Sequence, residues 1–327
     1  MMHRTFAASL AAVCCTVGLL RPATLVGQQP EQGYITTSDS ARLFYKIAGR
    51  PGPGVDTIIA IHGGPGLDLE SLYNDFAPAL GRKHVVIFYD QRGGGKSELP
   101  ADTTRLVAAR QIQDLDEVRR HFGLTQVTLV AHSYGPLLAA SYAIAHPDAV
   151  KKLVFFGSVP PRRGDFFTRY GQNLNARLDS VQRTSLARLD SIMSSDSASD
   201  DVVRTACRKF WAIGLRPRLA SPHGRRAVKA DLCATDPKGI RYGSKTANHV
   251  IMNSYGDWDL RPSLRTLDVP LLVVHGREET IPMDLVEEWV TSMSHARLFK
   301  VPNAAHFTYA EQPGLVWPVV ERFLARR

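Results

Sequence analysis

The chain has 327 residues, 44% of them hydrophobic, and carries 40 Lys and Arg against 31 Asp and Glu. This length and mixture of charges describe an ordinary globular protein, either one large domain with an insertion or two domains, and exclude a low-complexity chain. Nearly all of the formal net charge of +9 comes from residues 161–261, which hold 18 Lys and Arg against 10 Asp. That stretch lacks the interleaved aromatic residues and modules of a nucleic-acid-binding face, so we expect no nucleic-acid partner.

Residues 1–27 differ from the rest of the chain. MMHRT is positively charged, an uncharged apolar run extends from Phe6 to Leu20, and small or polar residues lead up to Gln28. Because the run is too short for a comfortable membrane span, it predicts a secretory signal peptide, with an uncleaved anchor as the alternative. We therefore expect a secreted or periplasmic protein, without stable membrane insertion once the segment is cleaved.

Residues 28–160 predict the first part of an α/β core. The expected strands are 33–37, 42–48, 57–62, 84–89, 126–131 and 152–157, and the expected helices are 70–80, 106–122 and 134–146. The first two strands alternate as an antiparallel pair, and the later, continuously apolar strands alternate with helices. This rhythm is typical of a mostly parallel, doubly wound sheet, whose ligands bind at the carboxyl ends of the strands.

Two glycine-rich loops follow strands of this core. His62-Gly63-Gly64-Pro65-Gly66 carries three glycines and a proline, more than a tight turn needs, so its amides are candidates for half of an oxyanion hole. The second loop, DQRGGGKS at 90–97, invites a phosphate-binding interpretation. Its spacing differs from that of a P-loop, so we expect no nucleotide.

The stretch QVTLVAHSYGPLLAAS, from Gln126 to Ser141, changes from a buried strand to a helix within five residues. Small residues two positions before and after Ser133 allow strand and helix to pass closely, a pattern that predicts a nucleophile elbow with an exposed hydroxyl. The Tyr134 amide lies at the helix N-terminus, where it favours a developing negative charge. The alternative is an apolar strand ending in an ordinary polar turn.

Residues 161–261 interrupt the strand rhythm and predict a mostly helical cap over the strand ends. Helices are expected at 166–178, 181–193, 202–213 and 245–253. Cys207 and Cys233 are the two cysteines that remain after removal of a signal peptide. In an oxidising compartment they either form a disulfide or stay as buried thiols, and the sequence leaves both open.

Residues 262–327 complete the predicted core, with strands at 269–275 and 297–301 and helices at 283–293 and 315–325. A serine nucleophile needs a base and an orienting carboxylate, and the chain order serine, acid, histidine is the one that this type of sheet uses. His306 follows the last strand and is the predicted base. Glu278 and Glu279 follow the strand before it, and Glu279 is the better placed acid because side chains alternate along extended chain.

The remaining histidines near the site have other predicted roles. His62 is expected to hold a loop through its ring, and His132 flanks the serine with its side chain directed elsewhere. We expect neither a metal nor a cofactor at this site.

Several of these motifs occur together in one known family. HGGPG at 62–66, DQRGGGKS at 90–97, the elbow with its helix, His146-Pro147-Asp148, and AAHFTYAEQP near the end resemble the prolyl iminopeptidase family of the α/β-hydrolase fold. The resemblance covers roughly 55–160 and 262–327. It implies a metal-free serine hydrolase that removes an N-terminal residue, often proline, from a peptide.

Carried over residue by residue, the resemblance implies Ser133 as nucleophile, Glu279 as acid, His306 as base, and the amides of Gly64 and Tyr134 as the oxyanion hole. This chain has Ala131, Tyr134 and Glu279 where the family usually has glycine, tryptophan and aspartate.

Members of the family grip the substrate ammonium with cap glutamates, and residues 161–261 contain no glutamate. An ammonium site would therefore need a cap aspartate such as Asp165, Asp257 or Asp259. The sequence assigns no substrate-binding residue.

Two activities follow from the same machinery. The first is an aminopeptidase acting on short peptides. The alternative is a carboxylesterase, lactonase or amidase acting on a small neutral or anionic substrate. A binding protein on an inactive hydrolase scaffold is disfavoured because the set of serine, glutamate and histidine is complete. The sequence does not indicate the oligomeric state.

Overall fold

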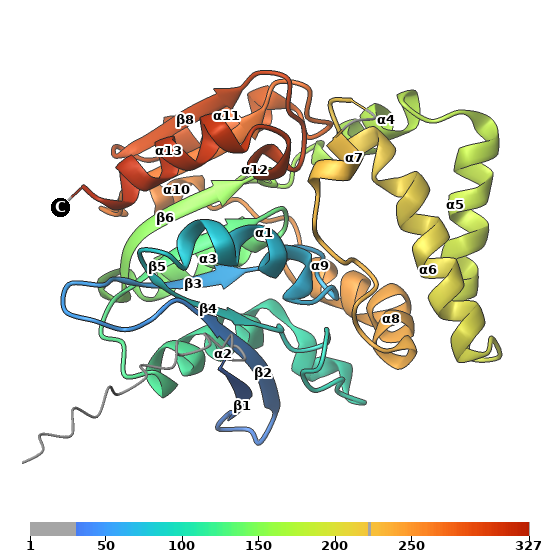
Figure 1. Ribbon diagram of the computed structural model, residues 1–327, viewed down its shortest axis with the longest axis horizontal. Helices are drawn as coiled ribbons and strands as arrows, with labels where there is room; N and C mark the ends of the chain where they lie inside the picture. The colour runs from blue at the N-terminus through green and yellow to red at the C-terminus, as the bar shows by residue number, and fades with distance from the viewer. Residues whose placement is uncertain (1–30, 222–223, 327) are drawn as a thin grey trace, which may run out of the picture. The chain divides into compact units, whose positions relative to one another are not determined.

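The computed structural model describes residues 31–221 and 224–326; the predicted signal peptide at 1–27 lies outside this part of the chain. The described residues form an eight-stranded sheet in the order β1-β2-β4-β3-β5-β6-β7-β8 (Figure 1). β1 pairs antiparallel with β2, and β2 with β4, while the other neighbouring strands are parallel. The strands are β1 (Gln32–Thr36), β2 (Arg42–Ala48), β3 (Thr57–Ile61), β4 (Val85–Tyr89), β5 (Val127–His132), β6 (Val150–Phe156), β7 (Leu271–Gly276) and β8 (Ala296–Val301).

Helices cover both faces of the sheet, as the alternation of strand and helix in the sequence predicts. The core helices are α1 (Glu70–Leu80), α2 (Ala108–His121), α3 (Gly135–Ala145), α11 (Met283–Ser292), α12 (Thr308–Glu311) and α13 (Pro313–Leu324). Buried side chains of α1 and α13 pack in one apolar cluster on the sheet, and those of α2, α3 and α11 pack in a second cluster. This arrangement confirms the predicted α/β-hydrolase architecture.

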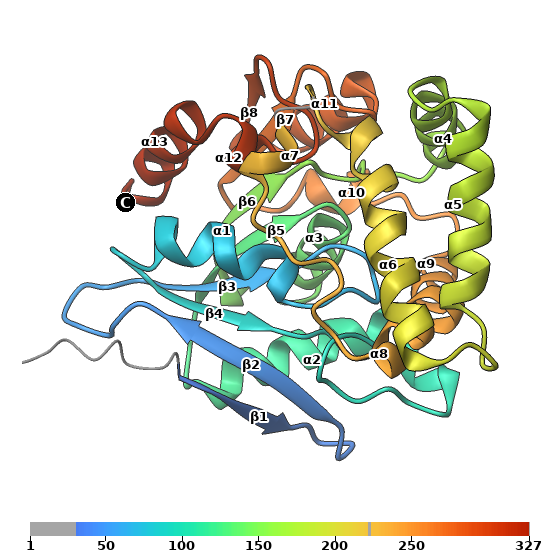
Figure 2. The ribbon, with the colours of Figure 1, turned by 45° about the vertical axis from the view of Figure 1, so that its right-hand side comes forward.

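The segment between β6 and β7 is helical in its described part, and we call residues 161–261 the cap. Its α-helices are α4 (Phe166–Ala176), α5 (Ser180–Met193), α6 (Asp200–Gly214), α7 (Gly224–Ala227), α8 (Pro237–Tyr242) and α9 (Asn248–Ser254). It also contains one 3-10 helix, η3 (Arg216–Arg218), and one π-helical turn, η4 (Gly243–Ala247). The short helix α10 (Arg261–Leu264) follows at the end of the cap. Figures 1 and 2 both show α4, α5, α6 and α9 beside the ends toward which the strand arrows point.

The two ends of the cap meet at its base. Arg162 and Asp259 form an isolated antiparallel bridge, and the Leu260 amide donates to the Pro161 carbonyl at 2.9 Å. The chain therefore leaves the core and returns to it at one place.

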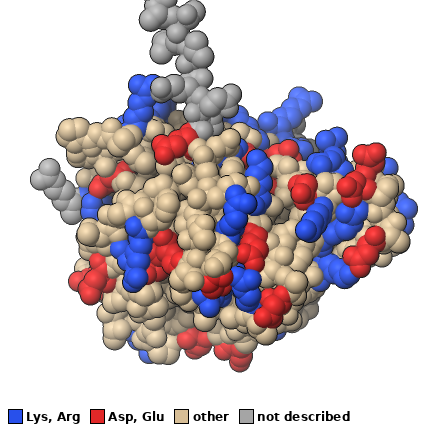
Figure 3. Space-filling view, turned by 90° about the horizontal axis from the view of Figure 1, so that it is seen from below, with Lys and Arg blue, Asp and Glu red and all other residues tan. Residues whose placement is uncertain are grey.

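Within the cap, Cys207 on α6 and Cys233 form a disulfide. Of the two alternatives that the sequence leaves open, the structure thus has the bridge. The cap is also the basic part of the molecule, and Lys and Arg side chains gather on the side that carries it, with Asp side chains between them (Figure 3).

The sequence-based elements differ from the observed ones mainly at short helices. The expected helix from Leu106 begins at Ala108, after a separate 3-10 helix η1 (Thr103–Leu106), and the expected helix 245–253 is divided between η4 and α9. The short helices α7, α8, α10 and α12 were not expected, because segments of one or two turns show no clear amphipathic period. No helix among the described residues is long and apolar enough to cross a membrane.

Candidate active site

Ser133 occupies the turn between β5 and α3, in a backbone conformation that few non-glycine residues adopt. Its φ is +62°, its amide donates to the Phe156 carbonyl at 2.9 Å, and its carbonyl accepts from the Val159 amide at 3.0 Å. A positive φ costs free energy, so it persists only where surrounding bonds impose it. Here the neighbouring strand β6 and the loop after it hold the serine in place.

The loop after β3 lies directly against this turn. A Cβ atom at Gly63 would be 2.8 Å from the Ser133 Cβ, closer than real Cβ atoms approach other heavy atoms. Glycine is therefore required for the loop to reach the serine. The next residue, Gly64, has a φ of +114°, which also favours glycine.

The predicted oxyanion donors are the amides of Gly64 and Tyr134. Neither amide donates to another residue of the described chain. Tyr134 immediately precedes α3, and its ring is buried with its hydroxyl 3.2 Å from that of Tyr255 in the cap. The structure thus leaves two main-chain N–H groups available, one on the turn that carries Ser133 and one on the loop after β3.

His62 and Gln91 join the two glycine-rich loops. The Gln91 amide donates to His62 Nε2 at 3.1 Å, and the Gln91 side chain donates to the His62 carbonyl at 2.8 Å. His62 Nδ1 lies 2.8 Å from the Gly63 carbonyl, so the ring carries its proton there. Burial lowers the His62 pKa to about 4, so the ring stays neutral and can accept. As the sequence predicts, His62 holds a loop through its ring.

Glu279 and His306 form a buried pair. His306 Nδ1 lies 2.7 Å from Glu279 Oε2, and the second carboxylate oxygen accepts from the Thr280 amide, the Thr280 hydroxyl and the Ile281 amide. Burial alone would raise the Glu279 pKa, but the charge and hydrogen bond of His306, the charge of His275 and the Ile281 amide lower it to about 2. Glu279 is therefore ionised and orients His306 through Nδ1.

The main chain of His306 is held on both sides. Its amide donates to the Arg218 carbonyl of the cap at 3.0 Å, and its carbonyl lies 3.1 Å from His132 Nε2. The His132 and His306 ring centres are 4.6 Å apart. Because His132 directly precedes Ser133, these contacts make the serine turn and the His306 loop neighbours.

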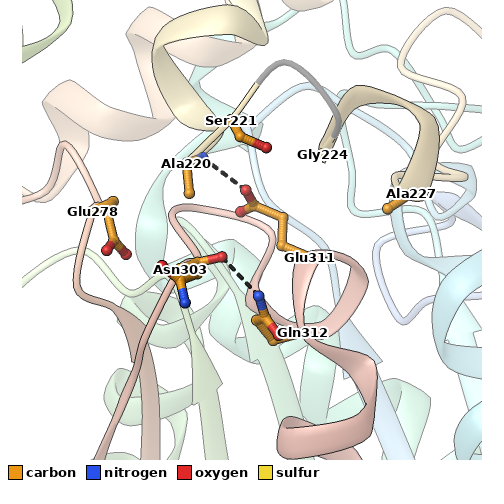
Figure 4. Close-up of a pocket in the computed structure, with 8 residues that line it drawn as sticks. All are labelled: Ala220, Ser221, Gly224, Ala227, Glu278, Asn303, Glu311 and Gln312. Atoms are coloured by element: carbon orange, nitrogen blue, oxygen red, sulfur yellow. Dashed lines mark hydrogen bonds between the residues drawn. The ribbon is translucent and has the colours of Figure 1, made fainter.

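Glu278, the alternative acid, lies elsewhere. Its carboxylate accepts from the Ala304 amide at 3.0 Å and lines a cavity of about 300 Å³ behind the His306 loop (Figure 4). Glu311 extends into the same cavity and accepts from the Ala220 amide at 2.7 Å and the Ala305 amide at 2.8 Å. The Glu311 carboxylate thus joins the cap to the His306 loop.

The cap also contacts the acid loop. Asn173 at the end of α4 donates to the Thr280 carbonyl at 2.8 Å, and Arg177 donates to the Glu278 carbonyl at 2.6 Å. The main chain on both sides of Glu279 is therefore bonded to the cap.

Two of the three cap aspartates that could hold a substrate ammonium are already paired with arginines. Asp259 lies 2.7 Å from Arg261, and Asp165 lies 3.9 Å from Arg169. Asp257 is exposed on the surface. Among residues 31–221 and 224–326, no group of His, Cys, Asp and Glu is arranged to hold a metal ion.

Sequence reasoning missed three residues of this site. Arg218 binds the His306 main chain, Thr280 binds Glu279, and His275 lies behind the acid with its Nε2 3.1 Å from the Ile281 carbonyl. His275 is the next-to-last residue of the apolar strand β7, and its position there was the one available signal. Arg218 and Thr280 carry no local pattern that marks them.

A model of the α/β-hydrolase fold family matches residues 56–313, and the chain belongs to this family. Among its relatives is the proline iminopeptidase of Heyndrickxia coagulans, 26% identical over 83% of this chain and 91% of the relative. The fold is shared with the crystal structure of proline iminopeptidase from Mycobacterium smegmatis, at a TM-score of 0.66 and 21% identity over 90% and 97% of the two chains. It is also shared with the enol-lactonase of Burkholderia xenovorans LB400, at a TM-score of 0.59 and 20% identity over 90% and 100% of the two chains.

Proposed function

We propose that the protein is a serine hydrolase in which Ser133 attacks, His306 transfers protons and Glu279 orients the histidine. The observation that carries this proposal is the 2.7 Å contact between His306 Nδ1 and the buried, ionised carboxylate of Glu279, because the His306 loop also contacts His132 beside the strained Ser133 turn. Such a pair keeps the imidazole in one tautomer, with Nε2 free to accept a proton.

The reaction would proceed through an acyl-enzyme. Ser133 Oγ bonds to the substrate carbonyl carbon as its proton passes to His306, and the oxygen takes up negative charge between the Gly64 and Tyr134 amides. His306 then gives its proton to the leaving group. Water then attacks the acyl-enzyme ester while His306 accepts a proton from the water. His306 returns this proton to Ser133 as the acid product leaves.

The proposed substrates are peptides with a free N-terminal residue, often proline. Support comes from the HGGPG and DQRGGGKS motifs together with relatives named proline iminopeptidase at 24–26% identity. Neither a metal nor a cofactor is required for this chemistry.

A carboxylic ester hydrolase is the second candidate, and one observation favours it. A substrate ammonium needs a carboxylate, and the cap has no glutamate and holds Asp165 and Asp259 in ion pairs with arginines. A small neutral or anionic ester, lactone or amide has no ammonium group, so it would bind without such a carboxylate.

Both candidates can be tested with three substrates: proline p-nitroanilide, p-nitrophenyl acetate and p-nitrophenyl butyrate. Hydrolysis of each is measured with the mature protein and with its Ser133→Ala variant. Release of proline from the anilide that is lost in the variant supports the aminopeptidase. Ester cleavage alone supports the second candidate. Activity that survives in Ser133→Ala would contradict the proposed nucleophile.

We also propose that the protein is exported, with residues 1–27 as its signal peptide. The disulfide between Cys207 and Cys233 supports this proposal, because such bonds persist in oxidising compartments. Mass spectrometry of the protein from a fractionated native or heterologous host should give a chain that begins near Gln28 in the exported fraction. A full-length chain in the cytoplasmic fraction would contradict it.

A further inference from the structure

We propose that the Arg218 guanidinium binds a carboxylate carried by the leaving group of the substrate, an inference that rests on the proposed serine hydrolase chemistry. The position of Arg218, the way its side chain is held, and the absence of a counter-ion among the described residues each support it.

Arg218 lies on the histidine side of the site. It ends η3, and its carbonyl accepts from the His306 amide at 3.0 Å. His306 would give its proton to the departing group, whereas the Gly64 and Tyr134 amides face the carbonyl oxygen on the other loops. Arg218 is therefore joined through its main chain to the residue that would protonate the leaving group, which favours the leaving-group side over the acyl side for its guanidinium.

The Arg218 side chain is half-buried and held in one direction. Its Nε donates to the Tyr170 hydroxyl at 3.2 Å and its Nη1 to the Gly214 carbonyl at 2.5 Å. The guanidinium carbon lies 5.9 Å from the ring centres of both Tyr170 and Trp211. Among the described residues, Nη2 has no acceptor, so its N–H groups can still donate hydrogen bonds to a ligand.

Tyr170 connects this arginine to the reacting groups. Burial raises the Tyr170 pKa, the charge of Arg218 lowers it, and the charge of Glu279 raises it. The net effect is a raised Tyr170 pKa, so the hydroxyl stays neutral and can accept the Arg218 Nε hydrogen bond.

Arg218 also differs from other arginines at the boundary of cap and core. Arg162 pairs with Glu288 at 2.8 Å, and Arg169 pairs with Asp284 at 2.7 Å. Arg218 makes no salt bridge within the described chain. A half-buried guanidinium beside aromatic rings is poorly hydrated, and a carboxylate is the partner that its planar fork binds best.

The chemical class that follows is a substrate whose leaving group has a carboxylate close to the scissile bond. For an aminopeptidase this is a dipeptide, because the released amino acid carries its α-carboxylate. For an ester hydrolase it is an ester of a hydroxy acid. The same arginine would disfavour a cationic leaving group.

The test compares matched substrates in which a neutral amide replaces the leaving-group carboxylate: prolylglycine with prolylglycinamide, and 3-acetoxybenzoate with 3-acetoxybenzamide. The proteins are the wild type, Arg218→Met, Arg218→Lys and the control Arg188→Met, which removes an exposed arginine of α5. The control measures the effect of net charge alone.

We expect wild-type kcat/KM to be higher for the charged member of the cleaved pair. Arg218→Met should lower that value by roughly ten- to a hundredfold, the size expected for a charge-assisted hydrogen bond, mainly through KM, and Arg218→Lys should restore part of it. The neutral member should change by less than about twofold, since the main-chain bond to His306 remains. Equal losses on both members, or a wild type without preference, would overturn the subsite.

Binding separates this inference from the proposed reaction. Calorimetric titration of Ser133→Ala and of Ser133→Ala with Arg218→Met uses benzoate and benzamide as probes. Benzoate binding that depends on Arg218 supports the subsite even if the wild type cleaves neither pair, which would contradict only the hydrolase. Equal binding of benzoate to both proteins would overturn the subsite.

Discussion

Glu279 reaches His306 although its side chain is one methylene longer than the aspartate usual in the family it resembles. The carboxylate turns back over its own loop, so that one oxygen accepts from Thr280 and Ile281 while the other meets His306. These bonds hold the longer side chain in the position from which it reaches His306. The alternation of side chains along an extended loop indicated Glu279 over Glu278, but it could not reveal Thr280.

At the same scale, His132 gives the stability a pH dependence. Burial, and then the charge of His306, lower the His132 pKa to about 3. The folded state keeps the ring neutral while the unfolded chain binds a proton below about pH 6.5, so stability is lost as the pH falls below that value. By pH 5 this one group should reduce the free energy of unfolding by about 2 kcal/mol relative to pH 8.

Urea denaturation of the wild type and His132→Gln at pH 8 and pH 5 measures this effect. The variant should be the less stable protein at pH 8, because it loses the packing of the imidazole ring against the His306, Phe307 and Tyr309 rings, and the difference should shrink by about 2 kcal/mol at pH 5. A difference independent of pH would contradict the neutral state of His132.

At the scale of elements, the two glycine-rich loops act as one unit through His62 and Gln91. The sequence shows each loop separately, and the continuously apolar strands β3 and β4 predict that both loops lie at one edge of the sheet. It does not show that Gln91 donates to the His62 carbonyl, because that contact depends on the order of strands in the sheet. The sequence alone identifies the glycines of both loops, whereas the hydrogen bond from Gln91 to the His62 carbonyl is seen only in the structure.

Gln91→Leu should therefore lower kcat more than it raises KM, since it loosens the loop that carries the Gly64 amide. It leaves the buried His62 carbonyl without a partner, which costs about 1–3 kcal/mol of unfolding free energy. Gln126→Leu is a matched control, because Gln126 also donates from its side chain to a carbonyl, that of Asp148, at 3.0 Å but on the exposed surface. Similar kinetic losses in both variants would contradict a positioning role for Gln91.

At the scale of the whole molecule, the cap is bonded to the loops of both Glu279 and His306. Asn173 and Arg177 hold the acid loop, and Arg218 and Ala220 reach the histidine loop, directly or through Glu311. The sequence predicted a helical cover from the loss of strand rhythm. It could not predict these contacts, because they join segments far apart in the chain and involve main-chain atoms, which leave no mark on residue type.

The disulfide between Cys207 and Cys233 closes a loop within this cap, with a sequence separation of 26. Its reduction, or the substitution Cys207→Ala with Cys233→Ala, should lower the free energy of unfolding by about 3–4 kcal/mol through the greater freedom of the unfolded chain. Denaturation with and without reducing agent checks this. The reducing agent should leave the double variant unchanged, and a wild type that also stays unchanged would contradict the bond.

The bridge between Arg162 and Asp259 bears on how proteins with this fold can acquire different caps. Since the inserted segment begins and ends at adjacent points, a different insertion could occupy the same opening without altering the register of β6 and β7. The cap can then change during evolution independently of the proposed catalytic residues on the core.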